Sequence, residues 1–224
     1  MHKHKREIAI QIALIVLAVI GTFALIRSIV KRGTAGTGKT VAQEDADLQE
    51  LYIEEWPELD VQLLDINAYS RPGIAIDEVN GIVVHYTANP GTTAQQNRDY
   101  FEGLAQSHAT HASSHFIIGL DGEIIQCIPC DEMAYASNSR NSDTISIECC
   151  IKEESGKFEE ATYNSLVELV GWLIGRYSLT TQDLLRHYDI TGKSCPKYFV
   201  DYPTKWVDFK EDVRAYIREN GVKR

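Results

Sequence analysis

Three residues that lie far apart in the sequence have side chains suited to binding a metal ion. His85 directly follows the apolar residues 82–84, and His187 and Cys195 stand close together in the stretch RHYDITGKSCP. Two imidazoles and one thiolate form a ligand set for a zinc ion that keeps its fourth position open for water. The spacing alone leaves a second interpretation open for each residue, namely an ordinary place in the core or on the surface.

The segments around these residues place them where functional groups are commonly found. His85 ends a predicted strand and begins the turn sequence HYTANPG, and strand ends carry functional groups in α/β proteins. His187 and Cys195 bracket Gly192 and precede Pro196, so the chain turns sharply between them. The turn lets both side chains converge on one point.

The elements that must position these residues alternate between strands and helices. Thr93 and Gln96 form a capping box that opens a helix through Leu104, and Asp121-Gly122 is typical of a hairpin turn. The remaining patterns predict strands over 81–86 and 144–150, hairpin strands over 115–119 and 123–128, and helices over 161–177 and 204–220. This order predicts an α/β fold, a single domain with a central mixed β-sheet flanked by helices.

The N-terminal third of the chain has a different composition. Residues 8–26 are apolar apart from Gln11, Gly21 and Thr22, and a helix of this length spans about 28 Å, close to the ~30 Å hydrocarbon core of a bilayer. We expect a short cytoplasmic tail over 1–7, a transmembrane anchor over 8–30, an acidic stalk or linker over 31–65 and the globular domain over 66–224. The run lacks an Ala-x-Ala cleavage motif, which favours an uncleaved signal-anchor, and its basic flanks are too balanced to orient it.

Charge and motif context exclude two classes of partner. Six Lys/Arg and one Glu give residues 1–32 a charge of +5. Since the net charge of the whole chain is −10, residues 33–224 carry −15. A domain this acidic does not favour binding to nucleic acid. Residues 33–40, GTAGTGKT, match a Walker A pattern literally. A phosphate-binding loop must follow a strand and open a helix, whereas this segment follows the apolar run, so we expect a spacer and no nucleotide.

Other histidines and cysteines give weaker signals. His111 and His115 have the spacing of a metal pair on a helix, but the Glu of a His-Glu-x-x-His motif is missing and His115 begins a predicted strand. Cys149 and Cys150 are adjacent on a predicted strand, so we expect them to point to opposite faces and to serve in packing. The cysteine count of five leaves at least one thiol outside any intramolecular disulfide.

Four stretches carry a resemblance to a known family. They are GIVVHYTANPG, SSHFIIGLDGEIIQCIP, AYASNSRNSDTISIE and RHYDITGKSCP, and they lie within residues 63–213. In this order they resemble the zinc-dependent N-acetylmuramoyl-L-alanine amidases of the type 2 family, which are related to phage lysozyme-type amidases and to peptidoglycan recognition proteins.

The resemblance assigns roles by position. It implies that one Zn²⁺ ion is bound by His85, His187 and Cys195, that Glu148 is the general base, and that Lys193 stabilises the oxyanion. These roles suit amide hydrolysis, because a zinc ion lowers the pKa of its water to about 7, one Glu can act as base and then as acid, and a cation favours the tetrahedral oxyanion.

The resemblance also implies substrate contacts and contains one departure. The polar loop before the Glu148 strand borders the groove for the stem peptide, so Asn138, Arg140 and Asn141 are candidate substrate-binding residues. Some members place a catalytic Tyr beside the residue that matches His115, and this chain has Ser114 there. The role of that Tyr is therefore absent in this chain or filled by another residue.

The function implied by the resemblance is hydrolysis of peptidoglycan between the lactyl group of N-acetylmuramic acid and the L-alanine of the stem peptide. The substrate lies outside the membrane, so we expect a single-pass cell-membrane protein with its catalytic domain on the extracytoplasmic side. The alternative is a non-catalytic peptidoglycan-binding receptor of the same fold. Such receptors typically lack the Cys or Asp ligand that Cys195 provides here.

Overall fold

The computed structural model describes residues 39–224, and one compact unit extends from Val41 to Arg224. Its centre is a six-stranded sheet in the order β2-β5-β4-β6-β3-β7. The strands are β2 (Asp60–Val61), β3 (Ile82–Tyr86), β4 (Phe116–Ile118), β5 (Ile124–Gln126), β6 (Ile145–Cys149) and β7 (Leu184–Arg186). Neighbouring strands run parallel except for β4 and β5, which are antiparallel. The predicted single α/β domain with a mixed sheet is therefore confirmed.

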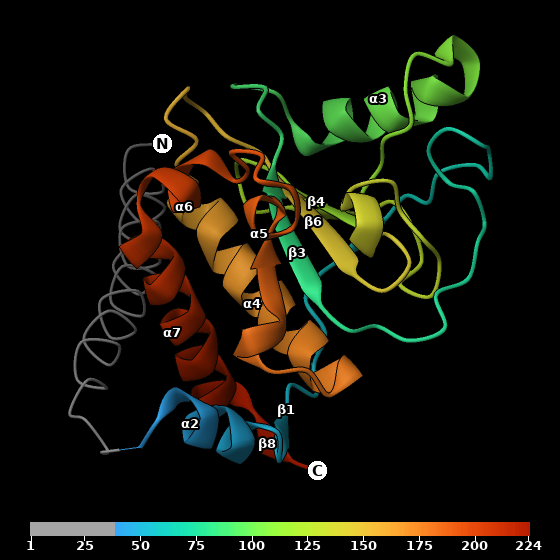
Figure 1. Cartoon of the computed structure of the whole chain (residues 1–224). Helices are drawn as coiled ribbons and strands as arrows, with labels where there is room; N and C mark the ends of the chain where they lie inside the picture. The colour runs from blue at the N-terminus through green and yellow to red at the C-terminus, as the bar shows by residue number, and fades with distance from the viewer. Residues whose placement is uncertain (1–38) are drawn as a thin grey trace, which may run out of the picture. The chain divides into compact units, whose positions relative to one another are not determined.

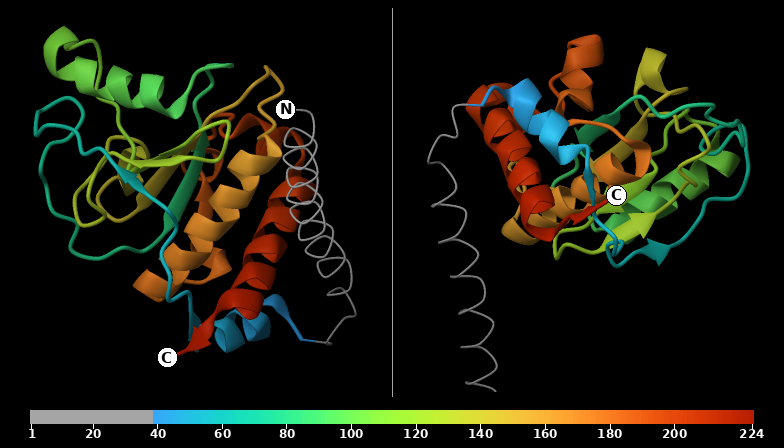
Figure 2. Two further views of the ribbon diagram at one scale, coloured as in Figure 1. Left: turned by 180° about the vertical axis from the view of Figure 1, so that it is seen from behind. Right: turned by 90° about the horizontal axis from the view of Figure 1, so that it is seen from below.

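Helices cover the two faces of this sheet (Figure 1). They are α2 (Val41–Leu48), α3 (Ala94–Ser107), α4 (Glu160–Tyr177), α5 (His187–Thr191), α6 (Lys197–Asp201) and α7 (Pro203–Asn220), with 3₁₀ turns η1 (Asn138–Arg140) and η2 (Thr181–Asp183). Helices α4 and α7 run side by side in the same direction on one face, and α3 lies on the other, as the reverse view also shows (Figure 2). The predicted helices over 161–177 and 204–220 match α4 and α7 within a residue.

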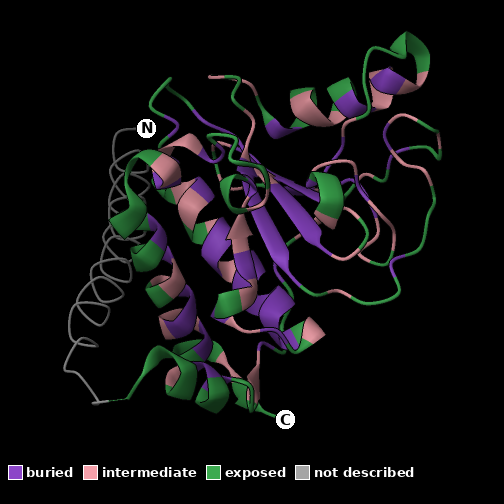
Figure 3. Cartoon of the chain, in the orientation of Figure 1, coloured by how far each residue is buried: buried purple, intermediate pink, exposed green. Residues whose placement is uncertain are grey.

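Strand alternation divides the core into two clusters. Val84 and Ile147 face α4 and α7, whereas Ile117 and Ile125 face α3. Because successive side chains of a strand point to opposite faces, β4 and β5 each contribute to both clusters. The central strands β3, β4 and β6 are accordingly almost entirely buried, whereas the edge strand β2 is exposed (Figure 3). Cys149 lies in the first cluster and the next residue, Cys150, in the second, as predicted.

Two turn signals in the sequence are confirmed in detail. The Thr93 hydroxyl accepts a hydrogen bond from the Gln96 amide at 3.1 Å, and the Gln96 side chain accepts one from the Thr93 amide at 3.0 Å, so the capping box opens α3. Gly122 ends the β4–β5 turn with φ of +89°, and a Cβ there would lie 2.8 Å from the hydroxyl of Ser165. Both the backbone conformation and the close approach of α4 require glycine at this position.

The structure corrects the predicted stalk. Residues 41–65 belong to the compact unit, because Leu48 and Ile53 are buried in the first core cluster and Leu64 in the second. The segment contains α2, and the residues after it form β1 (Leu51–Tyr52), which pairs with β8 (Val222–Lys223) near the C-terminus. The globular domain therefore begins near Val41 and not at residue 66.

A buried carboxylate explains how an acidic segment, predicted to be a stalk, can be part of the domain. The Asp45 carboxylate is buried, accepts a 2.8 Å hydrogen bond from the Thr181 hydroxyl and lies 3.6 Å from the guanidinium of Arg214, itself buried in α7. Buried carboxylates are tolerated where such partners exist. An acidic segment can therefore pack onto the domain as a structural element.

The predicted tail over 1–7 and anchor over 8–30 lie outside the described residues. Within residues 39–224, no helix has both the length and the apolar character needed to cross a bilayer.

Candidate functional site

Three parallel strands bring the predicted functional residues to one edge of the sheet. His85 on β3 is in register with Glu148 on β6, and side chains at paired positions of parallel strands point to the same face. β7 lies on the other side of β3, and His187 follows its last residue as the first residue of α5. All three side chains therefore reach the carboxyl-terminal edge of β3, which faces the upper part of the molecule in Figure 1.

A tight turn returns the chain to this edge. α5 ends at Gly192, which adopts φ of +77°, a conformation that glycine accepts without strain. The chain then folds back so that the Tyr188 amide donates a 2.9 Å hydrogen bond to the carbonyl of Cys195. As a result the Cys195 Sγ lies 3.7 Å from the Nδ1 of His85.

The three predicted ligands fit a metal ion. One ligand atom from each of His85, His187 and Cys195 lies within 4.8 Å of the other two, and each residue is more than nine-tenths buried. With zinc bonds of about 2.0–2.3 Å, tetrahedral geometry separates neighbouring donor atoms by roughly 3.3–3.7 Å, which the sulfur–nitrogen distance matches. The Nδ1 of His187 is buried without a hydrogen-bond partner, as expected of an atom reserved for a ligand.

Burial sets the protonation states at this edge. It lowers the pKa of His85 well below 6.5 and also lowers that of His187, so both imidazoles are neutral at pH 7. Burial raises the pKa of the Cys195 thiol to about 12 and that of Glu148 to about 8, although the nearby Lys193 opposes both shifts. One carboxylate oxygen of Glu148 is buried without a hydrogen-bond partner. The carboxyl group can therefore both hold and release a proton near neutral pH.

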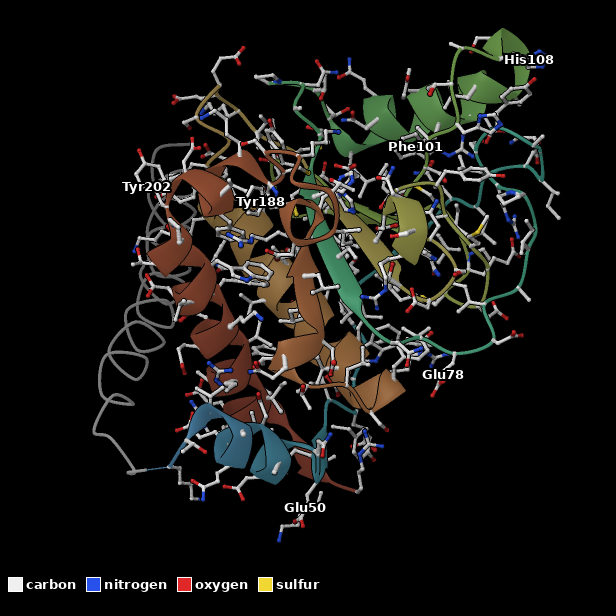
Figure 4. All side chains as sticks on the ribbon, viewed as in Figure 1. Glu50, Glu78, Phe101, His108, Tyr188 and Tyr202 are labelled. Atoms are coloured by element: carbon white, nitrogen blue, oxygen red, sulfur yellow. The ribbon has the colours of Figure 1, made fainter. Side chains whose placement is uncertain are left out.

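The site opens into a cavity of about 360 Å³. Glu148 and the three ligands lie in its wall together with Lys193, whose side chain is exposed to solvent. Figure 4 labels Phe101, which closes one side from α3, and Tyr188, which follows His187 and is exposed. The full lining is His85, Tyr86, Phe101, His111, Ala112, Ser113, Tyr135, Ala136, Asn138, Asn141, Glu148, His187, Lys193 and Cys195.

The polar loop before β6 makes contacts different from those expected. The Asn138 side-chain oxygen lies 2.8 Å from the Nε2 of His187. Asn141 uses its side-chain oxygen to accept the backbone amides of Ala136 and Ser137. Arg140 is not part of the cavity wall, and its guanidinium binds the Asp143 carboxylate at 2.8 Å. Asn138 and Asn141 thus reach the cavity, whereas Arg140 supports the loop behind it.

The position of the missing Tyr is occupied by a structural serine. The Ser114 hydroxyl is buried and donates to the carbonyls of Phe116 and Ser146 at 3.0 and 2.9 Å. His115 is also buried, with its ring nitrogens near Ser146 and the Glu132 carbonyl. His115 is therefore separate from the cavity, whereas His111 lies in the cavity wall.

Comparison with known proteins gives the family. The family model described as N-acetylmuramoyl-L-alanine amidase matches residues 76–198, a range that contains all five predicted ligand and catalytic residues. The chain belongs to the N-acetylmuramoyl-L-alanine amidase family. Two curated members of this family match this chain over more residues than the range 76–198.

Curated relatives and solved structures agree with this assignment. The chain is 34% identical over 172 residues to the N-acetylmuramoyl-L-alanine amidase CwlL of Bacillus licheniformis, a match that covers 71% of this chain and 47% of CwlL. It is 33% identical over 182 residues to the amidase BlyA of Bacillus subtilis, covering 72% of this chain and 48% of BlyA. The chain thus spans about half the length of the curated relatives it matches.

Two solved structures share the fold of the matched region. A mutant endolysin from Bacillus subtilis has a TM-score of 0.60 and 27% identity, covering 70% of this chain and 98% of the endolysin chain. The catalytic domain of XlyA has a TM-score of 0.60 and 26% identity, covering 70% of this chain and 99% of that domain. The fold of the matched region therefore resembles nearly the whole of both solved chains.

Some residues at this family site were not found from the sequence. Ser137 is buried with its hydroxyl 3.3 Å from the Nε2 of His85, and His111 and Tyr135 form part of the cavity wall with their rings packed edge to face. Ser137 lies within the motif AYASNSRNSDTISIE, so proximity to Asn138 was the available signal. The two aromatic residues come from loops whose approach to the cavity has no local sequence pattern.

Proposed function

We propose that this amidase-family chain hydrolyses the amide bond between the lactyl group of N-acetylmuramic acid and the L-alanine of peptidoglycan stem peptides. The observation that carries the proposal is the convergence of His85, His187 and Cys195 beside Glu148 at the mouth of one cavity. The family assignment supplies the bond that such a site would cleave. The relatives are longer than this chain, so the activity is proposed for the matched domain.

The donor set supports zinc as the cofactor. His85, His187 and Cys195 would hold one ion, and mixed nitrogen and sulfur ligands suit zinc better than the hard cations that prefer oxygen. The chemistry that zinc supplies when bound is Lewis acidity, which polarises a carbonyl and makes water a nucleophile at neutral pH.

Glu148 performs the proton transfers in this proposal. Its carboxylate takes a proton from the attacking water and returns it to the amine nitrogen that leaves with L-alanine. A pKa of about 8, raised by burial, makes the protonated form a stable carrier at neutral pH, and a bound cation would shift the balance toward the base form. The register of β3 and β6 keeps this carboxyl group on the same side of the sheet as His85.

Lys193 supplies positive charge to the cavity. Its ammonium group lies in the cavity wall and is close enough to lower the pKa of Glu148 and of both ligand histidines. A cation at this place stabilises the negative charge that develops on the carbonyl oxygen during attack. Because Lys193 is exposed, it can also move to meet the substrate.

Digestion of purified peptidoglycan tests the proposed reaction. Mass analysis should find stem peptides that begin with a free L-alanine amine, together with glycan that retains its lactyl groups. Glu148→Gln should reduce product formation by about 100-fold or more while zinc content is unchanged. Binding to peptidoglycan without release of any stem peptide by the wild-type protein would contradict the proposal and favour the non-catalytic receptor.

We also propose that residues 8–30 anchor the protein in the cell membrane with residues 41–224 on the extracytoplasmic side. The long apolar run supports the anchor, and the location of peptidoglycan supports the orientation. Two measurements test the proposal on the full chain: extraction of membranes with alkaline carbonate, and protease treatment of intact spheroplasts. Release by carbonate, or protection of the domain from protease until the membrane is broken, would refute it.

A further inference from the structure

One short loop contacts both ligand histidines on the side away from Cys195. The Ser137 hydroxyl lies 3.3 Å from the Nε2 of His85, and the Asn138 side-chain oxygen lies 2.8 Å from the Nε2 of His187. The inner nitrogens have different surroundings. The Nδ1 of His85 faces the Cys195 sulfur, and the Nδ1 of His187 is buried without a partner. The two rings lie 4.8 Å apart between centroids, at an angle of 65°.

The loop is built to hold this position. The Asn141 side chain accepts the backbone amide of Ser137 at 2.6 Å and that of Ala136 at 3.1 Å, which fixes the turn. Asn138 adopts φ of +52°, a left-handed conformation in which asparagine is several-fold enriched among non-glycine residues. The residue type thus satisfies two demands at position 138, because it accepts the backbone conformation and presents an oxygen to His187.

We infer that Asn138, assisted by Ser137, is a positioning residue that fixes Nδ1 of the histidines as the metal-binding nitrogen, and that it is not primarily a substrate contact. The inference rests on the proposed metal site and concerns only residues of this chain. An amide oxygen accepts but does not donate, so it selects the tautomer of His187 that carries its proton on Nε2. Nδ1 of His187 then keeps its lone pair toward Cys195 and His85.

The consequence is energetic as well as geometric. A neutral imidazole without an acceptor divides its proton between two nitrogens and turns more freely about its side-chain bonds. The hydrogen bond between Asn138 and His187 fixes both the tautomer and the orientation of the ring before the metal binds. Loss of such a hydrogen-bond partner of a metal ligand typically weakens metal binding by about 10–100-fold. The Ser137 contact with His85 is longer than the Asn138 contact with His187, so its contribution is the smaller of the two.

Three substitutions in the loop separate the hydrogen bond from the shape of the turn. Asn138→Gly removes the acceptor and keeps the left-handed backbone free of strain. Asn138→Asp keeps an acceptor oxygen on a side chain that also tolerates this conformation. Ser139→Gly changes the next residue of the same turn, which is exposed and lies outside the cavity wall, and serves as the matched control.

Zinc affinity of the full-length protein is the deciding measurement, by competition with a chromogenic chelator at pH 7.5. Asn138→Gly should bind zinc about 10–100-fold more weakly than wild type, whereas Asn138→Asp and Ser139→Gly should stay within about threefold. With cobalt in place of zinc, the thiolate charge-transfer band should persist in Asn138→Gly, and the ligand-field bands should change as the His187 ring loses its fixed orientation.

Two outcomes would overturn the inference. The first is an unchanged zinc affinity in Asn138→Gly together with a raised KM for peptidoglycan fragments, which would make Asn138 a substrate contact. The second is an equal loss of affinity in the Gly and Asp variants, which would assign the effect to the shape of the loop. A wild-type protein that binds zinc tightly but releases no stem peptide would refute the proposed reaction and leave the inference standing.

Discussion

Metal binding should release protons from the site in a number that the structure sets. The perturbation is removal of zinc with a chelator, followed by titration of the metal back into the protein. The ligands must lose their protons to bind, so every group that is protonated in the metal-free state contributes to the count. His85 and His187 contribute none at pH 7, because burial lowers the pKa of both below neutrality.

The magnitude follows from two buried acids. Cys195, with a pKa raised to about 12, is fully protonated at pH 7 and loses about one proton when its sulfur binds the ion. Glu148, with a pKa raised to about 8, is roughly 90% protonated at pH 7 and roughly 10% protonated at pH 9. The charge of the ion beside it should ionise the carboxyl group. Wild type should therefore release roughly 1.9 protons at pH 7 and roughly 1.1 at pH 9.

Isothermal titration in buffers of different ionisation enthalpy measures this count directly. The matched control is Glu148→Gln, which keeps the size of the side chain and should release about one proton at both pH values. The difference between wild type and this variant should fall from roughly 0.9 to roughly 0.1 between pH 7 and pH 9. A difference near zero at pH 7, or one that grows with pH, would show that Glu148 is already ionised in the metal-free site.

Three further predictions concern the rest of the domain. Deletion of residues 1–40 should leave a folded protein. Deletion of residues 1–65 should abolish the cooperative thermal transition, because it also removes the buried side chains of Leu48, Ile53 and Leu64. These contribute roughly 5–9 kcal/mol, whereas the whole free energy of unfolding of a domain is typically about 5–15 kcal/mol. Glu132→Gln should cost about 1.5–3 kcal/mol in urea unfolding at pH 7. Arg71 lowers the pKa of Glu132 in the folded state, so the extra free energy of unfolding of wild type over Glu132→Gln should disappear as pH falls below about 4.5 through the folded pKa. An equal decrease of the free energy of unfolding in both proteins would contradict this prediction. Tyr135→Ala should raise KM for muropeptides about 2–10-fold with kcat less affected, and an unchanged KM would remove this residue from the substrate-binding wall.

The elements that could be predicted from the sequence are those with a strong local pattern. Helices α4 and α7 repeat apolar residues at helical spacing, the Thr93 capping box marks the start of α3, and Asp121-Gly122 marks the hairpin. Each pattern describes an interaction between residues that are close in the chain. Their combination was sufficient to predict the mixed sheet, because a helix between two strands makes those strands parallel and a tight turn makes them antiparallel.

The segment over 41–65 could not be predicted for the opposite reason. Its packing depends on Arg214 and Thr181, which lie at the other end of the chain, and on a two-residue strand pairing between Leu51–Tyr52 and Val222–Lys223. Strands of two residues are too short to show alternation, and a buried Asp has the same letter as an exposed one. Only the tertiary contacts distinguish this structural segment from an acidic linker.

The site divides in the same way, and the division has a mechanistic consequence. His85 and Glu148 are held by the register of β3 and β6. A shift of either strand by one residue would turn its own functional side chain toward α4 and expel Val84 (from β3) or Ile147 (from β6) from the core. The hydrophobic core thus fixes the position of His85, a proposed metal ligand, relative to Glu148, the proposed proton carrier. The orientation of the second histidine, His187, depends instead on single hydrogen bonds from a loop. Substitutions in that loop should therefore change metal affinity while the sheet stays intact, whereas Glu148 should lose its position only when the β-sheet itself is disrupted.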